Sequence, residues 1–118
     1  MSESLSSHII FGEGRNTLQQ LQQESENPIL VKFVVPHYCP SCETLAPVLQ
    51  QIVTDQAGKV HMVTIDMTED PELAMELGVR SAPTVVLFKK TTVLERIAGL
   101  KPKILYFEAV QKVVSRSQ

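Results

Sequence analysis

The sequence predicts one α/β domain, with a central mixed sheet of about five strands flanked by about four helices. Apolar, β-branched segments alternate with segments of helical spacing, and the chain closes with a hairpin and a final helix. The length of 118 residues is that of one domain, and 43% apolar residues supply a core. No internal repeat, low-complexity segment or linker divides the chain.

We expect the first half of the chain to form two strands and two helices. We expect a flexible N-terminal tail at 1–7, followed by a single domain at 8–118. The domain is predicted to begin with a strand at 9–11, a helix at 15–25, a strand at 29–35 and a helix at 40–56. Gly12 is expected to close the first strand. The strand at 29–35 is almost wholly apolar, which is typical of a parallel strand covered on both faces. Pro40 suits the first position of the helix that follows.

The second half is predicted to add three strands and two helices. In order, these are a strand at 60–66, a short helix from 71 that ends at Gly78, a hairpin of strands at 84–88 and 92–97, and a helix at 102–115. Asp70 can cap the short helix, because its side chain can accept a hydrogen bond from the first turn. The last helix is expected to face the core with four apolar side chains, those of Ile104, Phe107, Val110 and Val114.

Composition and charge exclude several classes of function. The formal net charge is −2, and no basic patch or aromatic platform indicates a nucleic-acid partner. No apolar run approaches the ~18 residues of a membrane-spanning helix. The first seven residues lack the charged start and apolar segment of a secretory signal. We therefore expect a monomer in the cytoplasm or an organelle stroma, without a membrane partner and without a bound cofactor.

The two cysteines of the chain are spaced to react with each other. They stand in Cys39-Pro40-Ser41-Cys42, at the predicted start of a helix. Unpaired N–H groups and the helix dipole stabilise a thiolate in that first turn. Such a thiolate can attack a disulfide, and a second sulfur three residues on can resolve the mixed disulfide. The motif predicts a thiol–disulfide oxidoreductase in which Cys39 attacks and Cys42 resolves.

From about Ile9 to Val114 the chain resembles the thioredoxin family. The points of resemblance are the strand that runs into the C-x-x-C motif, Ala46-Pro47 in the helix beyond it, Gly78-Val79-Arg80-Ser81-Ala82-Pro83-Thr84, and Ala98-Gly99 before the last helix. The resemblance implies the thioredoxin fold, with a cis peptide bond before Pro83 beside the active cysteines. The segment from Asp66 to Gly99 is also similar to the thioredoxin domain fused to some NADPH-thioredoxin reductases of photosynthetic organisms.

The resemblance further implies how the protein meets its substrates. Pro83 is expected to shape a groove in which the backbone of Ala82 pairs with an extended substrate segment, as in β-augmentation. Gly99 leaves room beside this groove, and Tyr38 and Pro40 line its rim. The expected partners are proteins that contain disulfides, together with a thioredoxin reductase or another electron donor.

The chain departs from the family pattern around the cysteines. Tyr38 replaces the usual Trp before the first cysteine, and Pro40-Ser41 replaces the usual Gly-Pro. The buried Asp that the family has in the preceding strand is missing. Its place holds Lys32, or Phe33 when residues are counted back from Cys39. Because the family uses that acid to help deprotonate the second cysteine, we predict that the mixed disulfide is resolved slowly.

Two other classes of function remain open from the sequence. One is a metal or iron–sulfur binding module, because His37-x-Cys39-x-x-Cys42 has a conceivable ligand spacing and C-P-x-C resembles the glutaredoxin motif. The other is a non-catalytic adaptor that keeps the fold to bind partners. Lys32 also has two interpretations. It is structural, with Asp66 as a candidate partner, or it is a substitute base if it is buried and neutral.

Overall fold

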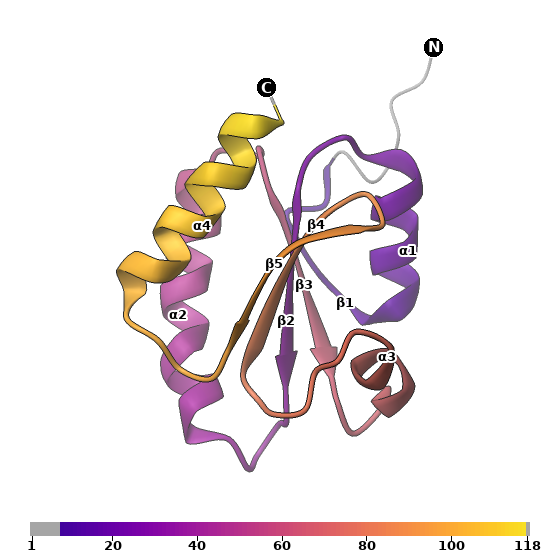
Figure 1. Cartoon of the computed structure of the whole chain (residues 1–118), viewed down its shortest axis with the longest axis vertical. Helices are drawn as coiled ribbons and strands as arrows, with labels where there is room; N and C mark the ends of the chain where they lie inside the picture. Colours follow the sequence, from indigo (N-terminus) through magenta and orange to yellow (C-terminus); the bar gives the residue numbers. More distant parts are fainter. Residues whose placement is uncertain (1–7, 118) are drawn as a thin grey trace.

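The computed structural model describes residues 8–117, which form one mixed sheet with helices on both faces (Figure 1). The strands are β1 (Phe11–Glu13), β2 (Ile29–Val34), β3 (His61–Asp66), β4 (Thr84–Lys89) and β5 (Thr92–Ala98). The helices are α1 (Gly14–Glu24), α2 (Pro40–Asp55), α3 (Pro71–Glu76) and α4 (Lys103–Arg116). This confirms the predicted fold class and order of elements.

The sheet order β1-β3-β2-β4-β5 places β2 at the centre. β3 runs parallel to β2, and β4 runs antiparallel to it. Five of the six residues of β2 are buried, which accounts for its apolar sequence. Since β2 and β3 are parallel, their carboxyl ends meet at one edge of the sheet, and the loop into α2 leaves from that edge.

An apolar core lies on each face of the sheet. Figure 1 shows α2 and α4 together on one side of the strands, and α1 and α3 on the other. Alternate residues of β2 divide between the two cores. Leu30 belongs to the core under α2 and α4, whereas Val31 and Phe33 belong to the core with α1 and α3. Lys32 therefore shares the face of Leu30, beneath α2.

The predicted strand at 9–11 is wrong in its position, because β1 covers Phe11–Glu13. Gly12, which we expected to end the strand, lies inside it. Helix α1 packs so closely there that a Cβ atom on Gly12 would lie 2.7 Å from Cγ2 of Thr17. Gly14, with a φ of 87°, makes the turn from β1 into α1. The glycine in the strand thus serves close packing.

The predicted inward face of the last helix is wrong in half of its residues. Ile104 and Phe107 are 55% and 39% exposed, whereas Val110 and Val114 are buried as predicted. The buried stripe of α4 consists of Tyr106, Ala109, Val110, Val113 and Val114. The predicted stripe and the buried stripe overlap on this helix, because Val110 and Val114 belong to both. The stripe with Tyr106 faces the core, where the tyrosine hydroxyl also finds backbone partners.

The predicted cap of the short helix is confirmed. Oδ1 of Asp70 accepts a hydrogen bond from the N–H of Leu73 at 3.1 Å, and Gly78, with a φ of 70°, follows the helix. Arg15 of α1 donates two hydrogen bonds to the same carboxylate, both at 2.8 Å. These bonds from Arg15 are the main reason that the pKa of Asp70 lies below its usual value.

Candidate active site

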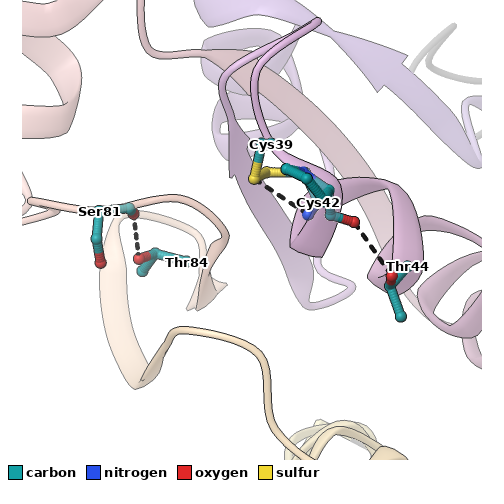
Figure 2. Close-up of a disulfide and its surroundings, with 6 residues drawn as sticks. Cys39, Cys42, Thr44, Ser81 and Thr84 are labelled. Carbon is teal, nitrogen blue, oxygen red and sulfur yellow. Dashed lines mark hydrogen bonds between the residues drawn. A yellow bond between two sulfur atoms is a disulfide. The ribbon is translucent and has the colours of Figure 1, made fainter.

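The two cysteines form a disulfide where β2 leads into α2 (Figure 2). The S–S bond is 2.13 Å long, and the two Cα atoms are 5.2 Å apart. Cys39 is the N-cap of α2, and Pro40 is its first residue. The backbone N–H of Cys42 donates a hydrogen bond to the sulfur of Cys39 at 3.1 Å. A donor that has no partner within the helix is thus directed at this sulfur.

The residues around the disulfide lie at the surface. Cys39 and Cys42 are only 9% and 7% exposed, but Tyr38, just before them, is 85% exposed. Pro40 is exposed as well, and its carbonyl accepts a hydrogen bond from the hydroxyl of Thr44 at 3.1 Å. The structure therefore places Tyr38 and Pro40 on the solvent side of the cysteines.

The segment before β4 lies at the same end of the sheet as the cysteines. The Ala82–Pro83 peptide bond is cis, as the resemblance implied. Figure 2 shows this segment, with Ser81 and Thr84, facing the disulfide. Thr84 is buried, and its hydroxyl donates a hydrogen bond to the carbonyl of Ser81 at 2.7 Å. Since Thr84 pairs with Phe33, the segment meets the sheet edge that carries the cysteines.

Gly99 lies against this segment. Its N–H donates a hydrogen bond to the carbonyl of Pro83 at 2.8 Å. Its φ of 81° lies in the left-handed region, which favours glycine. The structure therefore brings Gly99 and Pro83 together, although they are far apart in the sequence.

A cavity of about 190 Å³ lies beside the disulfide. Both cysteines line it, and so do Lys32, His37 and Glu43. Lys32 is 9% exposed, and its neighbours across the sheet are Thr64 and Val85. Burial lowers the pKa of Lys32, whereas attraction to Glu13 opposes this effect.

The suggested pairing of Lys32 with Asp66 is wrong. Oδ1 of Asp66 accepts hydrogen bonds from the N–H and the hydroxyl of Thr68, at 2.8 and 2.6 Å. The bond from the Thr68 side chain is the main reason that the pKa of Asp66 lies below its usual value. The carboxylate is used by the turn after β3, and within residues 8–117 the Lys32 amine has neither a hydrogen bond nor an ion pair.

Two residues that hold the site were missed from the sequence. Thr84 closes the turn at Pro83, and its position after the proline was the only signal for it. Tyr106 binds the backbone at Gly99 and Lys101 through its hydroxyl. It carried no signal, because its partners are main-chain atoms that the fold brings near.

The metal-binding alternative finds no support in the part of the chain that the structure describes. No group of three or more His, Cys, Asp or Glu side chains is arranged there to hold a metal ion. His37 therefore does not complete a ligand set with the cysteines. The described helices also include none that is long and apolar enough to cross a membrane.

Comparisons with known proteins agree on one family. The thioredoxin family model matches residues 12–112. A chloroplastic M-type thioredoxin of Chlamydomonas reinhardtii is 34% identical over 100 residues, which are 85% of this chain and 71% of that protein. NADPH-dependent thioredoxin reductase 3 of Arabidopsis thaliana is 37% identical over 99 residues, which are 84% of this chain but only 18% of the reductase. A solved thioredoxin structure from Nicotiana alata superposes with a TM-score of 0.77 at 26% identity and covers 96% of each chain.

Proposed function

Because the chain belongs to the thioredoxin family and is a protein thiol–disulfide oxidoreductase, we propose that Cys39 attacks substrate disulfides and that Cys42 resolves the mixed disulfide. One observation carries this order. Cys39 is the N-cap of α2, and its sulfur accepts the N–H of Cys42. That donor and the positive end of the helix dipole favour a thiolate on Cys39.

The proposed reaction has two exchange steps. The Cys39 thiolate attacks one substrate sulfur, so that a mixed disulfide forms and the other substrate sulfur leaves with the electron pair and takes a proton. Cys42, deprotonated, then attacks the Cys39 sulfur. The Cys39–Cys42 bond forms, and the second substrate sulfur leaves as a thiolate. Two electrons thus pass from the dithiol to the substrate, and no bound cofactor is required.

We propose that the substrate lies between two walls. Tyr38 and Pro40 form the rim on the side of α2, where both are exposed. Ala82, Pro83 and Gly99 form the other wall, and the backbone of Ala82 pairs with an extended substrate segment. The hydrogen bond between Gly99 and Pro83 supports the idea that this wall acts as one unit.

The proposed partners are disulfide-containing proteins and a thioredoxin reductase or another electron donor. The match to part of a thioredoxin reductase supports this type of donor. We further propose that the protein acts as a monomer with a single domain at 8–118. The tail that the sequence predicts at 1–7 lies outside the described residues. The chloroplastic name of one relative supports an organelle stroma over the cytoplasm as its location.

The test compares the unsubstituted protein with Cys39→Ser in the reduction of insulin disulfides by dithiothreitol. We expect the unsubstituted protein to accelerate the reaction and Cys39→Ser to lose the acceleration. A protein that binds insulin but gives no acceleration would be an adaptor. As a second readout, iodoacetamide at neutral pH should modify Cys39 before Cys42, and preferential labelling of Cys42 would reverse the proposed roles.

A further inference from the structure

Lys32 is a buried cation that the two exchange steps leave unused. It lines the same cavity as Cys39 and Cys42, and it is 9% exposed. Within residues 8–117, every fully buried side-chain nitrogen or oxygen atom has a hydrogen-bond partner. The Lys32 amine has none, so it must keep contact with solvent through the cavity. That contact offsets part of the cost of burying its charge, which lowers the pKa of Lys32.

Within residues 8–117, Lys32 forms no ion pair, although Glu13 attracts its positive charge. Glu43 of α2 and His37 of the preceding loop line the cavity, and neither forms an ion pair with Lys32. Glu13 of β1 is separated from Lys32 by Thr64, because β3 lies between β1 and β2. The remaining carboxylates, Asp66 and Glu69, line an adjoining hollow that Lys32 does not line.

The two sulfurs differ in what stabilises them as anions. The sulfur of Cys39 accepts the N–H of Cys42 at 3.1 Å. Within residues 8–117, no such donor reaches the sulfur of Cys42, which is the third residue of α2. The end of a helix carries about half an elementary charge, whereas an ammonium group carries a full one. A cation that lines the same cavity is therefore a further influence that favours a thiolate on Cys42.

We propose that the ammonium group of Lys32 activates Cys42 by stabilising its thiolate in the second exchange step. This inference rests on the proposed order of attack. The Cys42 proton leaves to solvent, and the thiolate attacks the Cys39 sulfur of the mixed disulfide. The Cys39–Cys42 bond forms, the bond to the substrate sulfur breaks, and the electron pair leaves on that sulfur, which takes a proton from water. Lys32 keeps its proton throughout.

The direct test is a titration of the Cys42 thiolate by its ultraviolet absorbance in the Cys39→Ser background. Lys32→Met keeps the side chain's bulk but removes its charge. It should move the midpoint to higher pH by about one unit or more. Lys32→Arg should hold the midpoint to within about 0.3 units, because the charge stays. Lys59→Met, which removes an exposed lysine before β3, is the control and should have no effect. If the Cys42 thiolate titrates with the same midpoint in the protein that keeps Lys32 and in Lys32→Met, the proposal is overturned.

The second test measures resolution directly, by the release of thionitrobenzoate from a mixed disulfide formed on Cys39. A thiolate of higher pKa is less abundant but more nucleophilic, so Lys32→Met should slow release by roughly threefold. Lys32→Arg should restore the rate, and Lys32→Asp should slow it further. Faster release from Lys32→Asp would overturn the proposal and show that the missing acid limits the rate. If Lys32→Arg releases thionitrobenzoate as slowly as Lys32→Met, the proposal is also overturned. Such a result would indicate that a neutral Lys32 amine acts as a base.

Failure of these tests can be distinguished from failure of the proposed function. The titration measures one charge effect on Cys42, whereas insulin reduction by the unsubstituted protein measures activity. Thermal unfolding of the oxidised proteins checks that each variant is folded, and Lys32→Gln replaces Lys32→Met if the latter is not.

Discussion

The hydroxyl of Tyr106 donates a hydrogen bond to the carbonyl of Gly99 at 2.9 Å. The same hydroxyl accepts the N–H of Lys101 at 3.0 Å, and the ring is 1% exposed. Gly99 in turn donates to the carbonyl of Pro83. Burial raises the pKa of Tyr106, so the phenol keeps the proton that it donates. Helix α4 thereby holds the proposed substrate wall.

We predict that Tyr106→Phe weakens substrate binding more than chemistry. Without the hydroxyl, Gly99 and Lys101 lose a common partner, and the wall at Pro83 becomes less well held. The KM for a protein disulfide should rise several-fold, while dithiothreitol should reduce the Cys39–Cys42 disulfide at an unchanged rate. The free energy of unfolding should fall by about 1 kcal/mol.

The control for this variant is Ser117→Ala. It removes a hydroxyl that donates to the carbonyl of Val113, near the other end of α4. It should leave KM unchanged. Equal KM values for Tyr106→Phe and the unsubstituted protein would show that the hydroxyl has no role in the wall.

The ion pair between Arg15 and Asp70 should make stability depend on pH. The pKa of Asp70 is lower in the folded protein than in the unfolded chain, so its stabilisation is complete at neutral pH and is lost as pH falls through the folded value. The melting temperature of Arg15→Met should lie below that of the unsubstituted protein at neutral pH. The difference should shrink below about pH 4, as the carboxylate is protonated.

Arg116→Met serves as the control for this prediction, because it removes an exposed arginine from the last turn of α4. The difference in melting temperature between Arg116→Met and the unsubstituted protein should not shrink as the pH falls. A difference for Arg15→Met that stays constant from neutral to acid pH would mean that the pairing contributes little.

His61, at the start of β3, should be important for stability but not for activity. It is 0% exposed, its Nδ1 donates to the carbonyl of Ile9, and its Nε2 accepts from the hydroxyl of Ser25 at 2.7 Å. His61→Leu removes both hydrogen bonds, although the Ser25 oxygen still accepts the N–H of Asn27. The loss should cost about 1–3 kcal/mol of unfolding free energy.

The cysteines lie at the opposite end of β3 from His61, so insulin reduction by His61→Leu should be normal while the protein is folded. Denaturant unfolding measures the stability of His61→Leu, and the insulin assay at low temperature measures its activity. Normal stability would show that the buried hydrogen bonds contribute little, and lost activity in a folded variant would show that the two ends of the sheet are coupled.

Most elements could be predicted because local chemistry marks them. The apolar run of β2, Pro40 at the start of α2 and the Asp70 cap of α3 all lie where the structure has them. The two errors depend on packing between elements. α1 packs closely against Gly12 within the strand. α4 turns Tyr106 inward, where backbone atoms of the segment before this helix bind its hydroxyl.

The site shows the same division. The cysteines and Pro83 could be identified from their motifs, because the reactive groups are local in the sequence. The surroundings of Lys32 could not, since they depend on the strand register and on which neighbours use their carboxylates. The sequence predicts Asp66 as a candidate partner of Lys32, but Thr68 binds that carboxylate.

The most direct test of the account is to trap the mixed disulfide. Cys42→Ser leaves Cys39 able to attack a protein disulfide but removes the sulfur that resolves the product. After exposure to an oxidised protein substrate, it should accumulate a covalent adduct through Cys39, visible by mass spectrometry and released by dithiothreitol. Cys39→Ser, treated in the same way, should accumulate little. Adducts that form on Cys39→Ser but not on Cys42→Ser would contradict the assignment of Cys39 as the attacking thiol.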